Sequence, residues 1–330
     1  MNVLTVSCAL AAVILAYLIF AVWPDWLVDV LGRKKTFVNT LLNGLTLAGL
    51  YFLVASGFTL VFGLMRNVNL AHGSMYLLGA YIGYEAAEAT GNWFFGAAIA
   101  FFAMAAVGAA LQIVVFRRMQ GDDLRQTLVT IGISIVAADL MLAVWTGTTY
   151  QFNPPEWLFG AVELPIISVI RSSGAAVMIK YPVYRLAVLA VAVAVGIALW
   201  LFLNRTRIGM MIRAGVNDRE MLAASGFNVQ LVFALVFALG AGLAGFAGVI
   251  GGTALSIAPG EDVRYLLASL IVVIVGGMGS ISGAAVGALL IAMAEQFGLA
   301  YFPTYGVVLT FVIMIIVLAV RPQGLMGGRA

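Results

Sequence analysis

Apolar windows of about 20 residues recur along the whole chain, and this feature decides what the chain can fold into. A helix of that length crosses roughly 30 Å of hydrocarbon. Of the 330 residues, 63% are hydrophobic and 9% are charged, whereas soluble domains average roughly 45–50% and 25%. A compact fold in water has too little interior to hide so much apolar surface. Because open sheet edges are not tolerated in lipid, we predict an all-α, multi-pass membrane bundle.

The windows predict about eight to ten transmembrane helices. Their approximate bounds are 3–23, 38–63, 70–90, 93–116, 127–146, 184–203, 229–254, 264–282, 284–299 and 306–320. The windows 264–282 and 284–299 flank Gly283 with almost no linker. They form either two short spans or a re-entrant hairpin.

Arginine clusters in the short loops set the orientation of the helices. They follow the windows that end at 116, 203 and 320, and their members are Arg117, Arg118, Arg125, Arg205, Arg207, Arg213, Arg219, Arg321 and Arg329. Counting spans places all of these on one side, which the positive-inside rule makes cytoplasmic. The stretch 147–183 then lies outside, as an ordered loop with at most one interfacial helix.

The N-terminal segment 1–36 does not fit this scheme, because Arg33-Lys34-Lys35 would lie outside. Residues 1–30 either do not cross the membrane or cross it against the rule. A cleaved signal peptide is disfavoured, since no positive residue precedes the apolar run. We therefore separate an extra or signal-like segment, 1–36, from a membrane domain, 37–330.

Several chemistries are excluded by missing residues. No Gly-Lys pair occurs, so the chain has no phosphate-binding loop of the ATPase type. One histidine, His72, and one cysteine, Cys8, exclude two-His zinc sites, internal disulfides and cysteine metal clusters. The net charge is +3, but no run of basic residues is long enough to bind nucleic acid. We expect no catalysis, no metal and no cofactor in this chain alone.

Two polar blocks interrupt the apolar windows. The block Asn67 to Ser74 is either a cytoplasmic turn that caps the next helix or a broken helix that lines a solute path. The loop 204–228 contains a predicted short amphipathic helix, Asp218 to Ala224, with Gly226 as its C-cap glycine. This loop is either a solvated charged segment or a helix that docks into a groove of a soluble partner.

Glycine is dense between residues 239 and 299, which favours close helix packing. The stretch Gly276 to Ser280 is expected inside an apolar helix, and its polar edge also suits a broken-helix path. Asp139 and Glu295 are predicted inside spans, where ionisable side chains face the bundle interior. We expect each to form hydrogen bonds across helices, with proton coupling by Asp139 as the alternative.

Four stretches, in the expected order, resemble the branched-chain (hydrophobic) amino acid permeases of ATP-binding cassette (ABC) transporters, specifically the H-type subunit. They are Asn43-Gly44-Leu45-Thr46-Leu47 to Gly63 with Asn69-Leu70-Ala71-His72-Gly73, the loop from Ile212-Arg213-Ala214 to Asn228, the run Val275 to Ala284, and Arg321-Pro322-Gln323-Gly324-Leu325. The resemblance covers about residues 37–330.

The resemblance implies a bacterial inner-membrane subunit that forms the path together with a second permease. It also implies two cytoplasmic ATPase subunits and a periplasmic binding protein that delivers branched-chain or related hydrophobic amino acids. The family's ATPase-contacting helix falls on Arg213 to Gly226, which assigns coupling to Arg213, Ala214, Asp218, Met221, Ala224 and Gly226. The translocation path is expected at Asn69, His72, Gly73, Gly276, Gly277, Gly279 and Ser280.

The chain also departs from the family pattern. Segment 1–36 is additional, and Ser225-Gly226-Phe227 stands where the family more often has Leu-Gly-Ile. Relatives carry urea, short amides or aromatic carboxylates, so these substrates remain alternatives. An ion-coupled secondary transporter that uses Asp139 or Glu295 is the runner-up among function classes, and an intramembrane enzyme is third.

Overall fold

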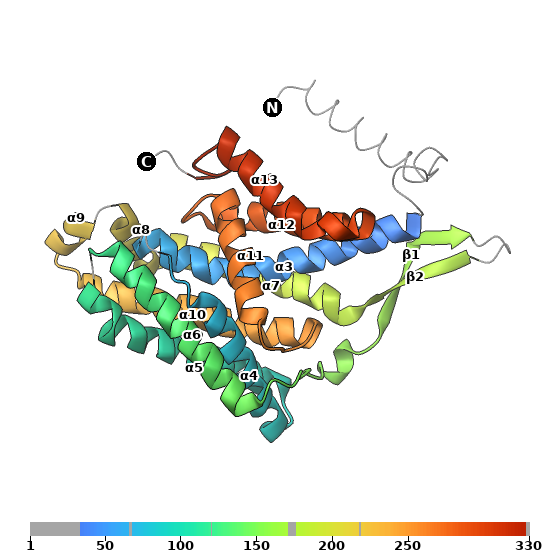
Figure 1. Ribbon diagram of the computed structural model, residues 1–330, viewed down its shortest axis with the longest axis horizontal. Helices are drawn as coiled ribbons and strands as arrows, with labels where there is room; N and C mark the ends of the chain where they lie inside the picture. Colours follow the sequence, from blue (N-terminus) through green and yellow to red (C-terminus); the bar gives the residue numbers. More distant parts are fainter. Residues whose placement is uncertain (1–33, 66–67, 120, 171–175, 218, 328–330) are drawn as a thin grey trace.

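The computed structural model describes residues 34–65, 68–119, 121–170, 176–217 and 219–327 (Figure 1). Long helices make up most of this part of the chain. They are α3 (Lys34–Met65), α4 (His72–Thr90), α5 (Trp93–Val114), α6 (Asp123–Trp145), α7 (Val183–Arg205), α8 (Arg207–Asn217), α9 (Arg219–Ala224), α10 (Val229–Ala254), α11 (Glu261–Gly276), α12 (Ile281–Tyr301) and α13 (Gly306–Val320). The connections contain η1 (Phe116–Met119), η2 (Glu156–Leu158), η3 (Pro303–Tyr305) and the strands β1 (Ala161–Ile170) and β2 (Ala176–Pro182).

The apolar windows from 38–63 to 306–320 each coincide with one helix, apart from 264–282, which also includes the turn at 277–280 and the start of α12. Window 3–23 lies outside the described residues. Seven of the described helices are long and apolar enough to cross a membrane. Helices α4 and α11 are not among them: α4 carries Glu85 and Glu88 near its end, and α11 has 16 residues.

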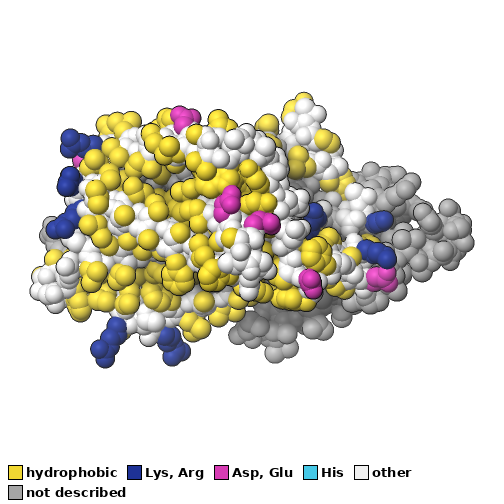
Figure 2. Space-filling view, turned by 90° about the horizontal axis from the view of Figure 1, so that it is seen from below, with side chains coloured by type: hydrophobic (Ala, Val, Ile, Leu, Met, Phe, Trp, Pro, Cys, Tyr) yellow, Lys and Arg dark blue, Asp and Glu magenta, His cyan; other side chains and the backbone are white. Residues whose placement is uncertain are grey.

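Helices α3 and α10 form the centre of the bundle. In their most apolar windows 89% and 78% of the residues are buried, against 11% in α6 and α13. Helix α10 packs on α3, α4 and α5, while α12 and α11 pack on the other side of α3. The apolar outer faces of α6 and α13 therefore meet lipid or another membrane subunit. Figure 2 shows hydrophobic side chains over the middle of one face, with Lys and Arg toward both ends.

Glycines allow the helix backbones of this centre to touch. A Cβ at Gly79 would lie 2.2 Å from the Cα of Gly245, and one at Gly240 would lie 2.8 Å from the carbonyl oxygen of Gly57. These contacts join α10 to α4 and α3. The glycine density between 239 and 299 thus serves close packing, as predicted.

For the stretch 147–183, the predicted loop with at most one helix is wrong in one respect. Besides the short η2, it forms an antiparallel hairpin of β1 and β2, at the end of the molecule opposite to α8 and α9 (Figure 1). Lys180 and Glu163 face each other across the hairpin at 2.9 Å, and this contact raises the pKa of Lys180. Both side chains are exposed, so the pair adds little stability.

The helix break near Gly283 is also displaced from its expected place. Helix α11 ends at Gly276, and residues 277–280 form a turn before α12. Gly277 and Gly279 have φ of +111° and +81°, a region that glycine adopts at little cost, so the chain reverses there. The Ser280 hydroxyl accepts a hydrogen bond from the backbone N–H of Gly283 at 3.0 Å and caps α12. Gly283 is therefore inside a helix.

Candidate functional site

An apolar groove lies between α8 and α9, at the end of the molecule that the arginine clusters predict to be cytoplasmic. Its volume is about 730 Å³, and it is lined by Arg207, Met210, Met211, Ala214, Met221, Leu222, Ser225 and Phe227. The side chains of Met210, Met221 and Phe227 are 51%, 68% and 49% exposed. The groove lies beyond the ends of the long apolar helices, where exposed methionine and phenylalanine favour a protein partner over lipid.

The floor of this groove is anchored to the membrane helices. Ile212 of α8 and Leu222 of α9 are 3% and 4% exposed. They pack in one cluster with residues of α3, α7 and α10, namely Leu60, Leu199, Val232, Phe233, Val236 and Leu243. A force on α8 and α9 therefore reaches three membrane helices through direct contacts.

The predicted coupling loop needs one correction. Residues 204–228 are mostly helical, because α8 occupies Arg207–Asn217. The Thr206 hydroxyl accepts from the N–H of Gly209 at 3.0 Å, which provides an N-terminal cap. The expected helix Asp218 to Ala224 appears as α9, and Asp218 lies outside the described residues.

Of the predicted coupling residues, Ala214 and Met221 line this groove, and the other described ones lie on or beside the same two helices. Arg213 and Ala214 lie on α8, and Arg213 donates to Oδ1 of Asn204 at 2.8 Å. Met221 and Ala224 lie on α9 and are exposed. Gly226 ends α9 with φ of +82°, the left-handed conformation of a C-cap glycine, and its N–H donates to the carbonyl of Ala223.

The block before α4 re-enters the bundle. Residues 68–71 are non-helical, and His72 at the start of α4 is 1% exposed, with Nε2 3.0 Å from the carbonyl oxygen of Val54. Val54 lies about three turns before the end of α3. Non-helical backbone at such depth requires burial in protein or a cavity. The geometry is that of a broken helix. Ala71 is the N-cap residue of α4. Its backbone N–H donates a hydrogen bond to Oδ1 of Asn69, which holds the preceding turn.

The glycines of the other expected path segment pack at the C-terminal end of α11. A Cβ on Gly63 of α3 would lie 3.1 Å from the Cα of Gly279. The C-terminal segment completes this junction, since Leu325 and Met326 donate to the carbonyls of Val275 and Gly276, both at 2.9 Å. The structure thus joins the late glycine run to the Arg-Pro-Gln-Gly-Leu ending, away from His72.

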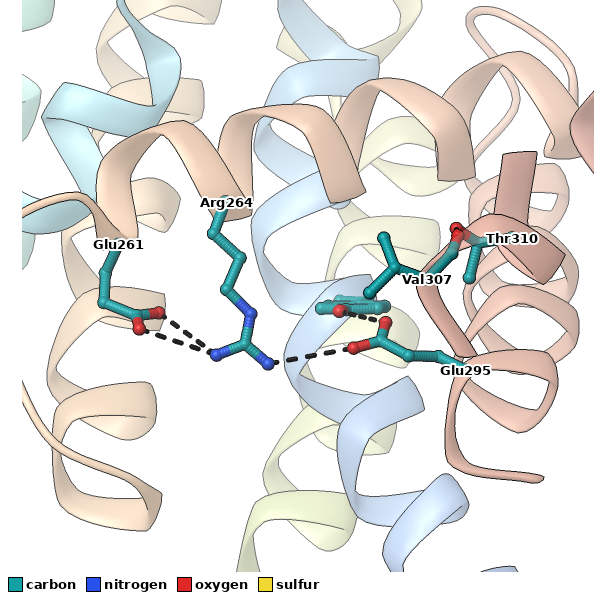
Figure 3. Close-up of polar contacts among 6 residues, drawn as sticks. Glu261, Arg264, Glu295, Val307 and Thr310 are labelled. Atoms are coloured by element: carbon teal, nitrogen blue, oxygen red, sulfur yellow. Dashed lines mark hydrogen bonds and ion pairs between the residues drawn. The ribbon is translucent and has the colours of Figure 1, made fainter. Parts of the chain in front are cut away.

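A cluster of polar side chains joins α3, α11 and α12. Glu295 is 8% exposed, and its Oε2 accepts a hydrogen bond from the Tyr51 hydroxyl at 2.5 Å. Its Oε1 lies 3.7 Å from Nη2 of Arg264, whose Nη1 lies 3.5 Å from both carboxylate oxygens of Glu261. Figure 3 shows the Arg264 guanidinium between the two carboxylates. We name Glu261, Arg264 and Glu295 the ionic triad.

Asp139 does not make the cross-helix contact that the sequence predicted. It lies on the exposed face of α6, and no residue in the described part of the chain pairs with it. Its neighbours Val136 and Leu140 are 58% and 60% exposed. This face meets lipid or another subunit, and the interior of this chain offers Asp139 no partner.

The sequence model of the family "Branched-chain amino acid transport system / permease component" matches residues 40–318. The chain belongs to this family. It is similar to the high-affinity branched-chain amino acid transport permeases BraD of Pseudomonas aeruginosa, at 30% identity over 88% of this chain and 96% of BraD, and LivH of Escherichia coli K12, at 29% over the same shares. The ribose import permease RbsC of E. coli K12 is 26% identical over 80% of this chain and 79% of RbsC. No solved structure matches the chain.

This branched-chain permease homologue is therefore a multi-pass transport subunit of the ABC class, and no catalytic activity is indicated for it. Sequence reasoning selected Glu295 but missed Tyr51, Glu261 and Arg264. One signal was available for Arg264: it stands at the edge of the window 264–282, where an arginine beside apolar residues calls for a partner.

Proposed function

We propose that this chain is the inner-membrane permease of an importer for branched-chain amino acids, driven by separate ATPase subunits and supplied by a binding protein. The observation that carries this proposal is the exposed apolar groove of α8 and α9 at the cytoplasmic end. The names of BraD and LivH support the substrate class. A second permease subunit completes the path.

The groove is the proposed docking site for an ATPase subunit. ATP-driven closure of the ATPases would move α8 and α9 together, since Ile212 and Leu222 share one packed cluster. That cluster transmits the movement to α3, α7 and α10. The proposed path residues lie on or beside α4 and α11, which pack on α10 and α3 respectively. They are Asn69, His72, Gly73, Gly276, Gly277, Gly279 and Ser280. We propose that their rearrangement switches access between the two sides.

Affinity purification of the tagged chain in mild detergent tests the proposal. We expect two ATPase chains and a second permease to copurify, and the reconstituted complex with its binding protein to import radiolabelled leucine only when ATP is inside. Uptake by this chain alone without ATP would overturn the proposal.

A substitution at Asp139 separates the proposal from ion-coupled transport. Because Asp139 lies on the outer face of α6, Asp139→Asn is expected to leave leucine uptake within about two-fold and its pH profile unchanged. The measurement is uptake into proteoliposomes between pH 5.5 and 8. Loss of uptake together with its pH dependence would instead support proton coupling by Asp139.

A further inference from the structure

The ionic triad lies within the membrane domain, where charged side chains are costly and usually functional. Glu295 stands inside the membrane-spanning helix α12, more than a turn before its outer end. Glu261 and Arg264 stand in the first turns of α11, whose Asp262 carbonyl oxygen closely approaches Gly73 at the start of α4. The backbone of α11 between Glu261 and Arg264 therefore contacts the start of α4, beside the re-entrant segment proposed for the path.

The guanidinium of Arg264 is held loosely. Its contacts to Glu261 and Glu295, at 3.5 and 3.7 Å, exceed the roughly 2.7–2.9 Å of a charge-assisted hydrogen bond. An arginine has five N–H donors, and the described residues offer this one no shorter bond. Its side chain is 47% exposed. A planar carboxylate can approach it in the two-bond geometry that arginine favours.

The carboxylates of the triad offer the opposite charge. Two glutamates and one arginine leave the triad with one excess negative charge when all are ionised. Glu295 is fixed by Tyr51, whereas the Glu261 side chain is 25% exposed. A cationic ammonium group is attracted to this pair of carboxylates, while a carboxylate is attracted to Arg264.

Apolar and aromatic groups complete the surroundings. Leu267 lies about one turn after Arg264, and Val263 lies one turn before Leu267; these two side chains are 45% and 54% exposed, so they offer an apolar surface beside the charges. The ring of Tyr265 lies 5.9 Å from Cζ of Arg264. Tyr265 is 2% exposed, and its ring centroid lies 4.2 Å from that of Tyr76, so the aromatic surface beside Arg264 is held in place.

We propose that Glu261, Arg264 and Glu295 form a transit site for the charged head of an α-amino acid, with its carboxylate on Arg264, its ammonium on the glutamates and its side chain along Val263 and Leu267. This proposal rests on the proposed function and names the groups that recognise the substrate. An uncharged sugar would use neither charge, so the triad favours a zwitterion over the ribose that the RbsC name states.

The test uses the complete importer in proteoliposomes with its binding protein, and compares Arg264→Gln with the wild type. We expect leucine uptake to fall at least ten-fold, while copurification of the ATPases and ATP hydrolysis stimulated by the binding protein stay within two-fold. Lys180→Gln is the matched control, because it removes a cation from an exposed ion pair outside the triad. The control is expected to transport normally.

Uptake by Arg264→Gln within two-fold of the wild type would overturn the transit site. If Arg264→Gln loses assembly and ATP hydrolysis along with uptake, Glu261→Gln decides, because Glu261 is more exposed than Glu295 and we expect it to lose uptake selectively. Normal uptake by Glu261→Gln would then overturn the transit site, and so would parallel loss of uptake, assembly and ATP hydrolysis in it, by showing that the triad merely ties α11 to α12. If the wild-type complex has no ATPase or imports no leucine, the proposed function itself fails, which is a distinguishable result.

Discussion

Gly73→Val is expected to prevent the bundle from assembling. A Cβ at Gly73 would lie 2.0 Å from the carbonyl oxygen of Asp262 and 2.8 Å from the Cβ of Leu266. The nearer contact is backbone, so no rotamer change relieves it, and α4 would have to move away from α11. Overpacking of this kind costs about 3 kcal/mol or more when the backbone must shift. The measurement is the monodisperse yield and thermal midpoint of the detergent-solubilised protein.

Gly132→Val is the matched control for this substitution. Gly132 is also helical, on the exposed face of α6, and a Cβ there meets no heavy atom within 4 Å. Its yield and midpoint should stay close to those of the wild type. Equal loss in the two variants would show that glycine is needed for helix flexibility and that the contact between α4 and α11 is unimportant.

The positions of the long helices follow from the sequence because the membrane imposes a minimum apolar length. The windows 93–116 and 229–254 agree closely with α5 and α10. The turn at 277–280 was missed for a physical reason: hydropathy does not report backbone conformation, and glycines in a close-packed helix and glycines at positive φ look alike in the sequence.

Helix α8 was missed because its apolar residues are interspersed with glycine and arginine, so they form no continuous apolar window. Its buried face nevertheless repeats every three residues, at Gly209, Ile212 and Gly215, which is a helical spacing. The β hairpin was missed because the whole stretch 147–183 was interpreted as a loop. The pattern of residues in its two strands was not tested for β structure.

The polar cluster was only partly predictable. An ionisable residue inside a span indicates a partner, and this argument selected Glu295. Its partner Tyr51 is 244 positions away in the sequence, and no local pattern links them. Pairing across helices depends on their rotation and depth in the bundle, which one sequence does not specify.

Gly226→Trp is expected to abolish binding of the ATPase subunits while the permease still inserts and folds. A Cβ at Gly226 meets no heavy atom within 4 Å, so the indole would project from the end of α9 into the space in front of the groove. The positive φ of +82° adds a local cost of about 1–2 kcal/mol, too small to unfold the bundle. The measurement is copurification of the ATPases and ATP-dependent leucine uptake, both expected to fall more than ten-fold.

Two matched substitutions separate the bulk of the indole from the backbone strain and from a general effect at the cytoplasmic end. Gly226→Asn keeps a residue that tolerates the left-handed conformation and should retain most binding. Gly121→Trp places the same indole at another open glycine, with φ of +90°, in the connection between α5 and α6. If Gly121→Trp lost ATPase binding as fully as Gly226→Trp, the docking site would extend over the whole of this end of the molecule. If Gly226→Trp bound the ATPases normally, α9 would not be the coupling helix. Selective loss in Gly226→Trp is the result expected if the groove of α8 and α9 receives the ATPase.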